Sequence, residues 1–533
     1  MCGIAGVVTR QPASSEQTVR QMVERGGHRG PDDRGTVSFA NCALGHARLS
    51  IIDPEGGAQP MTSDDGRIAL TFNGVIYNFR ELRLELERSG HQFLTTSDTE
   101  VLLRSYLEWG DRCPAHFNGQ FAFAIWDDEA RTLFAARDRL GEKPFYWATD
   151  SDGAFLFASE LKQLLASGRI RPILDPSAIA AYLALHYIPP NRTAYANVHS
   201  LLPGHTLTVT QDDVTTHRYW EPRFSHNDID HAEATVRIRE LVESAIERQL
   251  VADVPVGAFL SGGLDSATIV AGMSGRMQYR PMTFSVGFPG LVDERPYART
   301  VAKRYGTDHH EISIGIDAAA LVQKMADIYD EPFADSSNIP TYLLARFARS
   351  MTKVVLAGDG GDELFGGYTW YRRLREADQL ARYGLASVAA FTAGAAVHLL
   401  ARTGRRSVET YRRLERAQVL LEMAKQGSPI LQRHLHMSTY LSSLPTLGLG
   451  DDMPKVVTST LVNPLGQRAD VFLHRVPGGY RVVGGLRAGD QLGRRSPDIP
   501  KAAWAELDSK CQPFGDKTLL KLRAKHAAPD FVT

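Results

Sequence analysis

The second residue of the chain, Cys2, is of a type and at a place that could do chemistry. A thiol attacks only as the thiolate. Trimming of Met1 would leave Cys2 with a free α-amine, whose pKa of about 7.7–8 lets it take the thiol proton near neutral pH. One residue would then be both nucleophile and base. Taken by itself, a cysteine here is more often a small hydrophobic residue, buried with the strand-like run GIAGVV.

A glycine-rich loop, SGGLDS from Ser261 to Ser266, is the second candidate site. It separates a strand-like run, VPVGAFL, from a helix-like run, SATIVAGM. Glycines let the backbone approach an anion, and the N–H groups at a helix N-terminus hold negative charge. The loop matches neither the GxxxxGK[ST] phosphate loop nor the GxGxxG dinucleotide fingerprint. The bare motif therefore fits a phosphate site and a ligand-free turn equally well.

Asp265, inside this loop, favours the phosphate interpretation. A carboxylate that faces phosphates is repelled unless a cation lies between them, which indicates Mg²⁺. A second acidic turn, GDGGDE from Gly358 to Glu363, follows another strand-like run, KVVLA. Such a turn is usually just solvated, but its combination with Asp265 and a candidate phosphate loop favours a metal site.

The elements that must position these residues differ between the two parts of the chain. Over the first 165 residues, short apolar or alternating runs are separated by turn-forming residues, which predicts an antiparallel α+β domain with few helices, such as 79–90 and 99–110. From about residue 232, helix-like and strand-like runs alternate, which predicts an α/β domain with a parallel sheet. We expect domains over 2–205 and 232–533, with a linker over 206–231.

Composition and charge exclude several classes of protein. Apolar residues make up 43% of the 533 residues and charged residues 23%, as in ordinary soluble globular proteins. The 60 basic and 61 acidic side chains leave a net charge of −1, so no global field attracts nucleic acid or an anionic membrane. The cysteines are scattered, which argues against a disulfide scaffold or a structural zinc site. They are Cys2, Cys42, Cys113 and Cys511.

The location follows from the absence of targeting patterns. The N-terminus has no basic segment followed by a long apolar stretch, so it does not resemble a signal peptide. The most apolar later stretch, 385–400, is too short for a confident membrane span and is predicted to be a buried helix. We expect a cytoplasmic protein that binds no nucleic acid and no membrane.

Four motifs follow one another in the first 100 residues: HRGPDDRG at 28–35, GHARLSIID at 45–53, TFNGVIYN at 71–78 and TSDTE at 96–100. Each is weak alone, because the same residue types make ordinary turns. Together with Cys2, and in this order, they resemble the glutamine amidotransferase domain of the N-terminal-nucleophile class. Within that class the sequence is most similar to glutamine-dependent asparagine synthetase. The resemblance implies an αββα sandwich for this domain.

The resemblance also implies roles in the hydrolysis of glutamine. Cys2 would attack the side-chain amide, and Asn73 with the N–H of Gly74 would stabilise the oxyanion of the tetrahedral intermediate. Arg48 would pair with the α-carboxylate of glutamine, a geometry that suits a guanidinium, and Asp98 would hold its α-ammonium. The implied glutamine-binding residues are Arg48, Leu49, Ile51, Asn73, Gly74 and Asp98.

One position departs from the family pattern NGEIYN. Val75 stands where the family has a glutamate that helps to hold the α-ammonium, and a valine side chain accepts no hydrogen bond. We therefore expect weaker glutamine binding, with ammonia as the better nitrogen donor. A normal KM for glutamine that is unchanged in Val75→Glu would contradict this expectation.

In the second half, the order SGGLDS, TFSVGF at 283–288, DEPFADSSNIPT at 330–341 and LAGDGGDELFGGY at 356–368 resembles the ATP-pyrophosphatase domain of asparagine synthetases. The resemblance implies ATP and Mg²⁺ as cofactors and cleavage of ATP between the α and β phosphates. The substrate carboxylate would attack the α phosphate and release pyrophosphate. Ammonia would then displace AMP from the acyl-adenylate.

The residues that match this second domain receive roles in the same way. Asp265 and Asp362 would be Mg²⁺ ligands, Asp359 would lie near the reacting carbonyl as an acid, base or orienting group, and Glu363 would orient its neighbours. The loop from Ser261 to Ser266 would hold pyrophosphate. Leu260, Val286 and Gly287 would contact adenine. The implied ATP-binding residues are Leu260, Ser261, Gly262, Gly263, Leu264, Asp265, Ser266, Val286, Gly287 and Gly358.

The resemblance thins beyond about residue 375. GDDMPK at 450–455 begins a family match that the next residues do not continue, and the segment from about 455 to 515 is atypical. Similarity returns at GDKTLLKLRAKHAAPDF, which places the family's catalytic lysine at Lys517, where its charge would stabilise the adenylation transition state. Two hypotheses fit this departure: a carboxylate pocket rebuilt for another acid, or a region damaged, for example, by a compensated frameshift.

We therefore expect a two-site ligase. One site releases ammonia from glutamine, and the other amidates an ATP-activated carboxylate, by default aspartate, with ammonia passing between them through an internal channel. Two alternatives stay open: an amidotransferase or lactam-synthetase-like enzyme acting on another carboxylate in specialised metabolism, and a synthetase-impaired relic. The expected partners are glutamine and aspartate or another small carboxylate, with a homodimer implied by the family alone.

Overall fold

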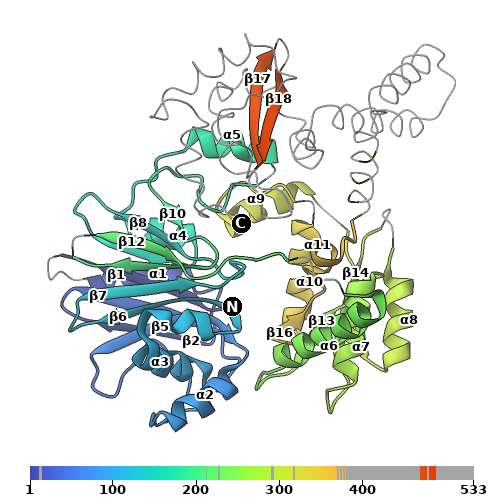
Figure 1. Cartoon of the computed structure of the whole chain (residues 1–533), viewed down its shortest axis with the longest axis horizontal. Helices are drawn as coiled ribbons and strands as arrows, with labels where there is room; N and C mark the ends of the chain where they lie inside the picture. The colour runs from blue at the N-terminus through green and yellow to red at the C-terminus, as the bar shows by residue number, and fades with distance from the viewer. Residues whose placement is uncertain are drawn as a thin grey trace. The chain divides into compact units, whose positions relative to one another are not determined.

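The computed structural model describes residues 1–10, 15–185, 187–211, 213–225, 229–289, 293–315, 318–335, 337–368, 371, 375, 379, 469–476 and 479–487. The chain divides into two compact units. The first unit comprises Met1–Leu174, Pro190–Glu221 and Ser225–Asp359. The second comprises Asp175–Pro189, Pro222–Phe224 and the chain from Gly360 onward. Figure 1 labels the helices and strands of both units.

Two antiparallel sheets lie in the first unit. The first has the strand order β10-β8-β9-β1-β3-β2, and β1 and β3 pair at its centre with Gly3 opposite Ala47. The second has the order β12-β11-β7-β6-β5-β4. The strands of the first sheet are β1 (Gly3–Val8), β2 (Asp33–Ser38), β3 (Cys42–Arg48), β8 (Tyr146–Thr149), β9 (Phe155–Ala158) and β10 (His199–Ser200). Those of the second are β4 (Met61–Thr62), β5 (Ile68–Ile76), β6 (Gly119–Asp127), β7 (Thr132–Arg137), β11 (His205–Val209) and β12 (Val214–Arg218).

Helices cover the outer face of each sheet. On the first sheet, α1 (Ser15–Arg25) and α4 (Leu161–Ala166) bury apolar residues such as Val19 and Leu164. On the second, α2 (Phe79–Arg88) and α3 (Asp98–Trp109) pack with the short 3₁₀ helix η1 (Gly110–His116). A third cluster, which includes Ile4 and Trp126, fills the space between the sheets. The layers therefore form the αββα sandwich that the sequence predicted.

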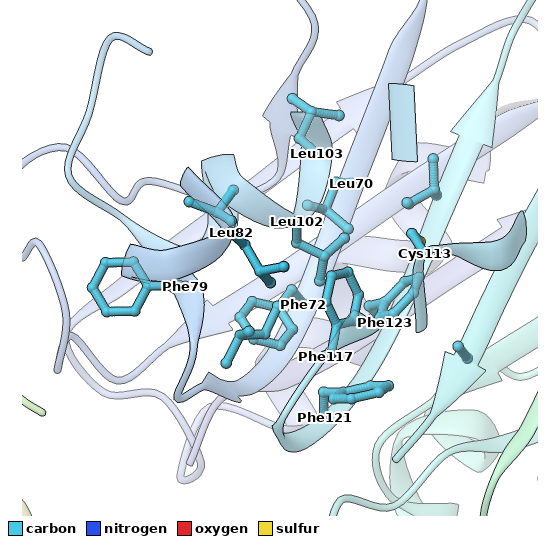
Figure 2. Close-up of a cluster of buried hydrophobic side chains, with 14 of the residues drawn as sticks. Leu70, Phe72, Phe79, Leu82, Leu102, Leu103, Cys113, Phe117, Phe121 and Phe123 are labelled. Atoms are coloured by element: carbon cyan, nitrogen blue, oxygen red, sulfur yellow. The ribbon is translucent and has the colours of Figure 1, made fainter. Parts of the chain in front are cut away.

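The aromatic cluster of the outer layer shows why this half folds as it does. Figure 2 shows Phe117, Phe121 and Phe123 close to Phe72 and Leu102. Alternate residues of β5 and β6 point to the helices because side chains of a strand alternate between its faces. Burial of such side chains stabilises the fold by about 1.5–3 kcal/mol each. The packing fixes β5, which carries part of the candidate site.

The later part of the first unit contains a parallel sheet, as the alternating pattern predicted. Its order is β15-β14-β13-β16, with every neighbouring pair parallel. The strands are β13 (Val256–Phe259), β14 (Met282–Gly287), β15 (Asp308–Ser313) and β16 (Val354–Leu356). The accompanying helices are α6 (His231–Gln249), α7 (Leu264–Ser274), α8 (Arg295–Tyr305), α9 (Ala318–Tyr329) and α10 (Asn338–Arg349).

Local signals explain where two of these helices begin and end. The side chain of Asp230 accepts a hydrogen bond of 2.8 Å from the Glu233 N–H and so caps α6. Pro296 lies in the first turn of α8, and Gly306 ends that helix with a left-handed φ of 65°. Both helices belong to the alternating pattern predicted from about residue 232.

The second unit contains α5 (Pro176–Leu185), α11 (Gly361–Phe365) and an antiparallel strand pair. The pair is β17 (Ala469–Val476) and β18 (Gly479–Arg487), with a register irregularity at Phe472 and Leu473. It lies inside the atypical segment, where no helix or strand was predicted. The predicted helix at 385–400 lies outside the described residues. In the part of the chain that is described, no helix has both the length and the apolar character needed to cross a membrane.

Candidate active site

Cys2 immediately precedes β1, opposite the end of β3. Its sulfur accepts a hydrogen bond of 3.3 Å from the Leu49 N–H. Burial raises the pKa of the thiol, while the Leu49 hydrogen bond and the charges of Arg29 and Arg48 act to lower it. Burial also lowers the pKa of the α-amine at Met1 to about 5. This amine belongs to Met1, whose removal would leave the α-amine of Cys2 itself beside the thiol.

Arg48, the last residue of β3, is buried beside the loop that follows it. Its Nη1 donates to the Pro54 carbonyl at 2.7 Å, and its Nη2 donates to the carbonyls of Asp53 at 2.6 Å and Ile52 at 3.4 Å. A guanidinium has five N–H donors. The three backbone contacts therefore fix its orientation and leave two donors for a carboxylate ligand.

Asp98 is buried at the first turn of α3, where the Ser97 side chain caps the helix. Its Oδ2 accepts a hydrogen bond of 3.1 Å from the Ile76 N–H at the end of β5. Burial raises the pKa of this carboxyl to about 7, although the Ile76 N–H and the Arg48 charge act to lower it. A buried carboxyl of this kind favours a cation as its ligand.

Asn73 lies on β5, and its side chain is 1% exposed. Both polar atoms of its amide are buried without a hydrogen-bond partner among the described residues. Asn73 shares a face of β5 with Thr71, because alternate residues share a face. The hydroxyl of Thr71 bonds to His46 of the other sheet at 3.1 Å, so this face looks toward the sheet that begins at Cys2. Unpartnered buried amides are rare and call for a ligand.

Gly74 has a packing reason to be glycine. A Cβ there would lie 2.2 Å from the Gln120 carbonyl oxygen and 2.7 Å from the Phe121 Cα of β6. Val75, the next residue, packs against the aromatic cluster of the helical layer. Asn73 and Gly74 thus lie on β5, whose last residue, Ile76, is hydrogen-bonded to Asp98. Val75, which departs from the family pattern, makes an apolar contact.

Two residues of the later part of the first unit hold the segment from Leu49 to Asp53, which includes the predicted residue Ile51: Asp253 directly, and Lys353 through Asp32. Asp253 donates its N–H to the Ile51 carbonyl at 3.0 Å and accepts the Asp53 N–H at 2.7 Å. On the other side, Asp32 accepts both the Ser50 N–H at 2.9 Å and Lys353 Nζ at 2.6 Å. The segment predicted to bind glutamine is therefore connected to residues that precede β13 and β16.

The loop from Ser261 to Ser266 connects β13 to α7 as predicted. Its two serine hydroxyls bond to each other at 3.0 Å, and Ser261 Oγ accepts the Gly263 N–H at 3.1 Å. The Gly262 N–H donates to the Glu294 carboxylate at 3.1 Å. The Gly262 N–H thus binds an anionic oxygen, that of Glu294, as it would in a loop that binds phosphate. The exposed side chain of Leu264 begins the helix.

The remaining predicted nucleotide residues lie on neighbouring strands. Leu260 is buried, and its N–H donates to the Phe284 carbonyl at 2.9 Å. Val286 and Gly287 end β14, beside it. A Cβ at Gly358 would lie 2.7 Å from Asp265 Cβ, so the loop after β16 packs directly against the first turn of α7. The structure thereby brings Gly358 and Asp265 together.

The acidic residues divide between the two units. Asp359 is exposed and ends the last segment of the first unit. Asp362 and Glu363 lie on α11 in the second unit, where Glu363 accepts a hydrogen bond of 2.7 Å from the Tyr368 hydroxyl. The pairing of Asp362 with Asp265 at a metal stays a prediction. Lys517 lies outside the described residues.

The described residues offer too few clustered metal ligands for a site made by their side chains alone. Within the described ranges, no group of three or more His, Cys, Asp or Glu side chains is arranged to hold a metal ion. Mg²⁺ commonly takes one or two carboxylates together with substrate phosphates and water. Asp265, placed at the loop that would hold those phosphates, fits that arrangement.

Two charged residues near the site were not given a role from the sequence. Arg29 donates its Nε to the Cys2 carbonyl at 2.8 Å, although it lies in the motif HRGPDDRG. Lys143 is buried and bonds to the side chain of Gln120, and burial lowers its pKa. The motif marked Arg29 as a candidate, whereas nothing in the local pattern around Lys143 predicts burial.

Fold and site together define a class: an N-terminal-cysteine glutamine amidotransferase domain followed by a nucleotide-binding α/β part. The family model of the glutamine amidotransferase domain matches residues 1–220, and that of asparagine synthase matches residues 237–450. A protein of this class from Methanocaldococcus jannaschii, named as a glutamine-hydrolysing asparagine synthetase, is 38% identical over 393 residues, which are 69% of this chain and 76% of that protein. The chain belongs to the glutamine-hydrolysing asparagine synthetase family.

Two other comparisons set the extent of this similarity. Asparagine synthetase 3 of Bacillus subtilis is 37% identical over 406 residues, which are 70% of this chain and 64% of that protein. The chain thus spans less than two thirds of that relative. A solved structure of the glutamine phosphoribosylpyrophosphate amidotransferase from B. subtilis covers 60% of this chain and 70% of its own, at 18% identity and a TM-score of 0.33. That overlap is too low to add to the fold described above.

Proposed function

We propose that this protein hydrolyses glutamine at Cys2 and uses the ammonia to amidate a carboxylate that ATP has activated, with aspartate as the acceptor and asparagine as the product. The observation that carries the proposal is the amide of Asn73, which is buried, has no partner among the described residues and lies on the face toward the sheet that begins at Cys2. Membership of the asparagine synthetase family supports the choice of acceptor.

The glutaminase chemistry follows from the polar groups of the first site. After removal of Met1, the amine of Cys2 takes the thiol proton, and the thiolate attacks the carbonyl carbon of the glutamine side chain. Asn73 Nδ2 and the Gly74 N–H stabilise the oxyanion. Collapse of the intermediate releases ammonia and leaves a thioester, which water hydrolyses to glutamate and the free thiol. Arg48 and Asp98 hold the two charged ends of glutamine.

The second site is proposed to act on ATP. The loop from Ser261 to Ser266 offers backbone N–H groups to the pyrophosphate, and Leu260, Val286 and Gly287 face the adenine. Mg²⁺, held by Asp265 and Asp362, would supply positive charge to the phosphates. Asp359 would lie near the reacting carbonyl as an acid, base or orienting group, and Lys517 would add a positive charge to the adenylation transition state.

Location and assembly are proposed on the resemblance alone. Ammonia would pass between the two sites inside the protein, because free ammonia is protonated in water at neutral pH and then no longer attacks. A homodimer in the cytoplasm is the expected form. Val75 would weaken glutamine binding relative to a chain with glutamate at this position, since valine offers the α-ammonium no acceptor.

A different acceptor carboxylate is the second candidate. The atypical segment from about 455 to 515 favours it, because the resemblance to the family is lost there and the described part of the segment forms the strand pair β17 and β18. A panel of carboxylates, tested for stimulation of AMP release, separates this candidate from aspartate.

The origin of the nitrogen that enters asparagine, from glutamine or from ammonium, tests the proposal. With ATP, Mg²⁺, aspartate and glutamine labelled with ¹⁵N in its amide, the protein is expected to form ¹⁵N-asparagine. Cys2→Ala is expected to lose this transfer and to keep synthesis from ammonium chloride, because the thiolate acts only on glutamine. Transfer that persists in Cys2→Ala would overturn the assignment of the nucleophile.

A further inference from the structure

A chain of four buried charged side chains connects the backbone of Cys2 to the motif DEPFADSSNIPT, for which neither site described above has a role. Arg29 donates its Nε to the Cys2 carbonyl at 2.8 Å and its Nη1 to Glu160 Oε1 at 2.8 Å. Lys162 Nζ lies 3.4 Å from Glu160 Oε2 and 3.1 Å from Asp330 Oδ1. Asp330 is the first residue of the motif.

The burial of these groups sets them apart from surface ion pairs. The side chains of Arg29, Glu160, Lys162 and Asp330 are 8%, 13%, 9% and 11% exposed. Exposed ion pairs contribute little, whereas removal of one member of a buried pair leaves an uncompensated charge. The two cations and two anions of the chain balance each other, so each member depends on the next.

Asp330 is held in an unusual backbone conformation. It follows the end of α9 with a φ of 63°, a left-handed value that is uncommon for residues other than glycine. Its Oδ2 also accepts the backbone N–H of Lys162 at 3.0 Å. In addition, Lys162 Nζ donates to the carbonyls of Asp327 at 2.6 Å and Ile328 at 3.2 Å. Strain of this kind persists only where surrounding contacts determine the position, and it clusters at functional sites.

Glu160 joins this network to the strands at Cys2. It begins α4, and the residue before it, Ser159, exchanges backbone and side-chain hydrogen bonds of 3.0 Å with Ile4 of β1. His28 also contacts the Glu160 carboxylate, at 3.0 Å. Displacement of Glu160 would therefore act on Arg29, and through Arg29 on the carbonyl of the nucleophilic residue.

We propose that Asp330 and Lys162 are positioning residues of the glutaminase site, which fix the main chain of Cys2 through Glu160 and Arg29. The inference rests on the proposed hydrolysis of glutamine at Cys2. It assigns the start of the DEPFADSSNIPT motif, which belongs to the nucleotide-binding part of the chain, a task in the other active site. The nucleophile is then aligned only when the two parts of the first unit are in contact.

Glutamine hydrolysis in the full-length protein, assayed without ATP, tests the proposal. Asp330→Asn and Lys162→Met are expected to lower kcat by about tenfold or more, because small misplacements of a reacting group are costly. KM for glutamine should stay within about twofold, since Arg48 and Asp98 are untouched. The double variant, in which both charges are absent, should be no worse than the more impaired single variant. Losses that multiply, or single variants that match the wild type, would overturn the proposal.

A matched control uses another ion pair that joins the same two parts. Arg248 of α6 lies 2.9 Å from Glu81 of α2, and both side chains are substantially exposed. Arg248→Met should leave kcat and KM unchanged, because this pair does not contact the segment around Cys2. Lys162→Met should also keep ammonia-dependent AMP release within about twofold, which separates misalignment of Cys2 from general unfolding.

A second readout keeps the inference separate from the proposed function. The rate at which iodoacetamide alkylates Cys2, followed by mass spectrometry of its peptide, reports the setting of the thiol without turnover. Asp330→Asn and Lys162→Met should change this rate by about threefold or more, with no change in Arg248→Met. If the wild type fails to hydrolyse glutamine, the proposed function falls, and an unchanged alkylation rate in both variants overturns this inference independently.

Discussion

The buried amide of Asn73 is the group on which the oxyanion assignment depends at the residue scale. Its Nδ2 has no partner among the described residues, so substrate would satisfy it. Asn73→Ala is expected to lower kcat for glutamine hydrolysis by about 10²–10³-fold, the usual cost of a lost oxyanion donor. KM should change little, because the donor acts mainly in the transition state.

Ammonia-dependent AMP release provides the control for this substitution. It should be unaffected in Asn73→Ala, because that activity bypasses the glutaminase site. If Asn73→Ala raises KM for glutamine and leaves kcat intact, the amide binds ground-state substrate and the oxyanion role is wrong.

Asp98 is predicted to make glutamine binding depend on pH. Burial raises the pKa of its carboxyl to about 7, and only the charged form attracts the α-ammonium of glutamine. The carboxyl is protonated below its pKa, so affinity should fall as the pH falls through 7. Titration calorimetry on the inactive Cys2→Ser variant should show binding about tenfold weaker at pH 6 than at pH 8.

The matched variant for this pH dependence is Asp98→Asn. An amide does not titrate, so this variant should bind glutamine weakly and with little change between pH 6 and pH 8. If the affinity of the Cys2→Ser protein with Asp98 intact is flat over this range, Asp98 is not the ammonium ligand or its pKa is not raised.

At the scale of elements, the close packing of two loops at the ends of β13 and β16 supports the nucleotide site. A Cβ at Gly358 would lie 2.7 Å from Asp265 Cβ and 3.0 Å from the Ser266 nitrogen. Gly358→Ala should therefore push the first turn of α7 away and lower ATP-dependent AMP release by about tenfold or more. Glutamine hydrolysis should remain within about twofold of the wild type.

Gly275→Ala is the control glycine in the same part of the chain. A Cβ there would meet no atom closer than 4.0 Å, so AMP release should be unchanged. Equal activity in both glycine variants would mean that the contact between Gly358 and Asp265 does not shape the nucleotide loop.

The sequence predicted the elements where periodicity and turn chemistry agree. The alternation from α6 to β16, including the loop after β13, appears in the structure as expected, because buried parallel strands are continuous apolar runs. Helices α2 and α3 were predicted by their apolar spacing. The strand pair β17 and β18 was not, because its segment is rich in glycine and charge and has no clear period.

Single positions of the candidate site followed from motifs, whereas their connections did not. The order of motifs pointed to Cys2, Arg48 and Asp98, and the structure links them through Leu49 and the end of β5. The chain from Arg29 to Asp330 could not be predicted, because its members come from segments more than 100 residues apart. Only the tertiary fold brings such charges together and buries them.

At the scale of the whole first unit, β13 and β16 lie between the two proposed sites. Asp253, which precedes β13, contacts Asp53 in the segment that is proposed to bind glutamine. Lys353, which precedes β16, contacts Asp32, and Asp32 accepts the Ser50 N–H of that segment. The carboxyl ends of β13 and β16 carry the proposed nucleotide loops, in keeping with where α/β sheets bind ligands.

Release of AMP and pyrophosphate from ATP and Mg²⁺ is the most direct test of asparagine synthesis at the second site. The assay compares ammonium chloride alone with ammonium chloride plus aspartate. We predict that AMP release depends on aspartate. One asparagine should form for each AMP, because amidation requires the adenylate. A protein that hydrolyses glutamine but forms no AMP with aspartate would contradict the claim that its second site makes asparagine.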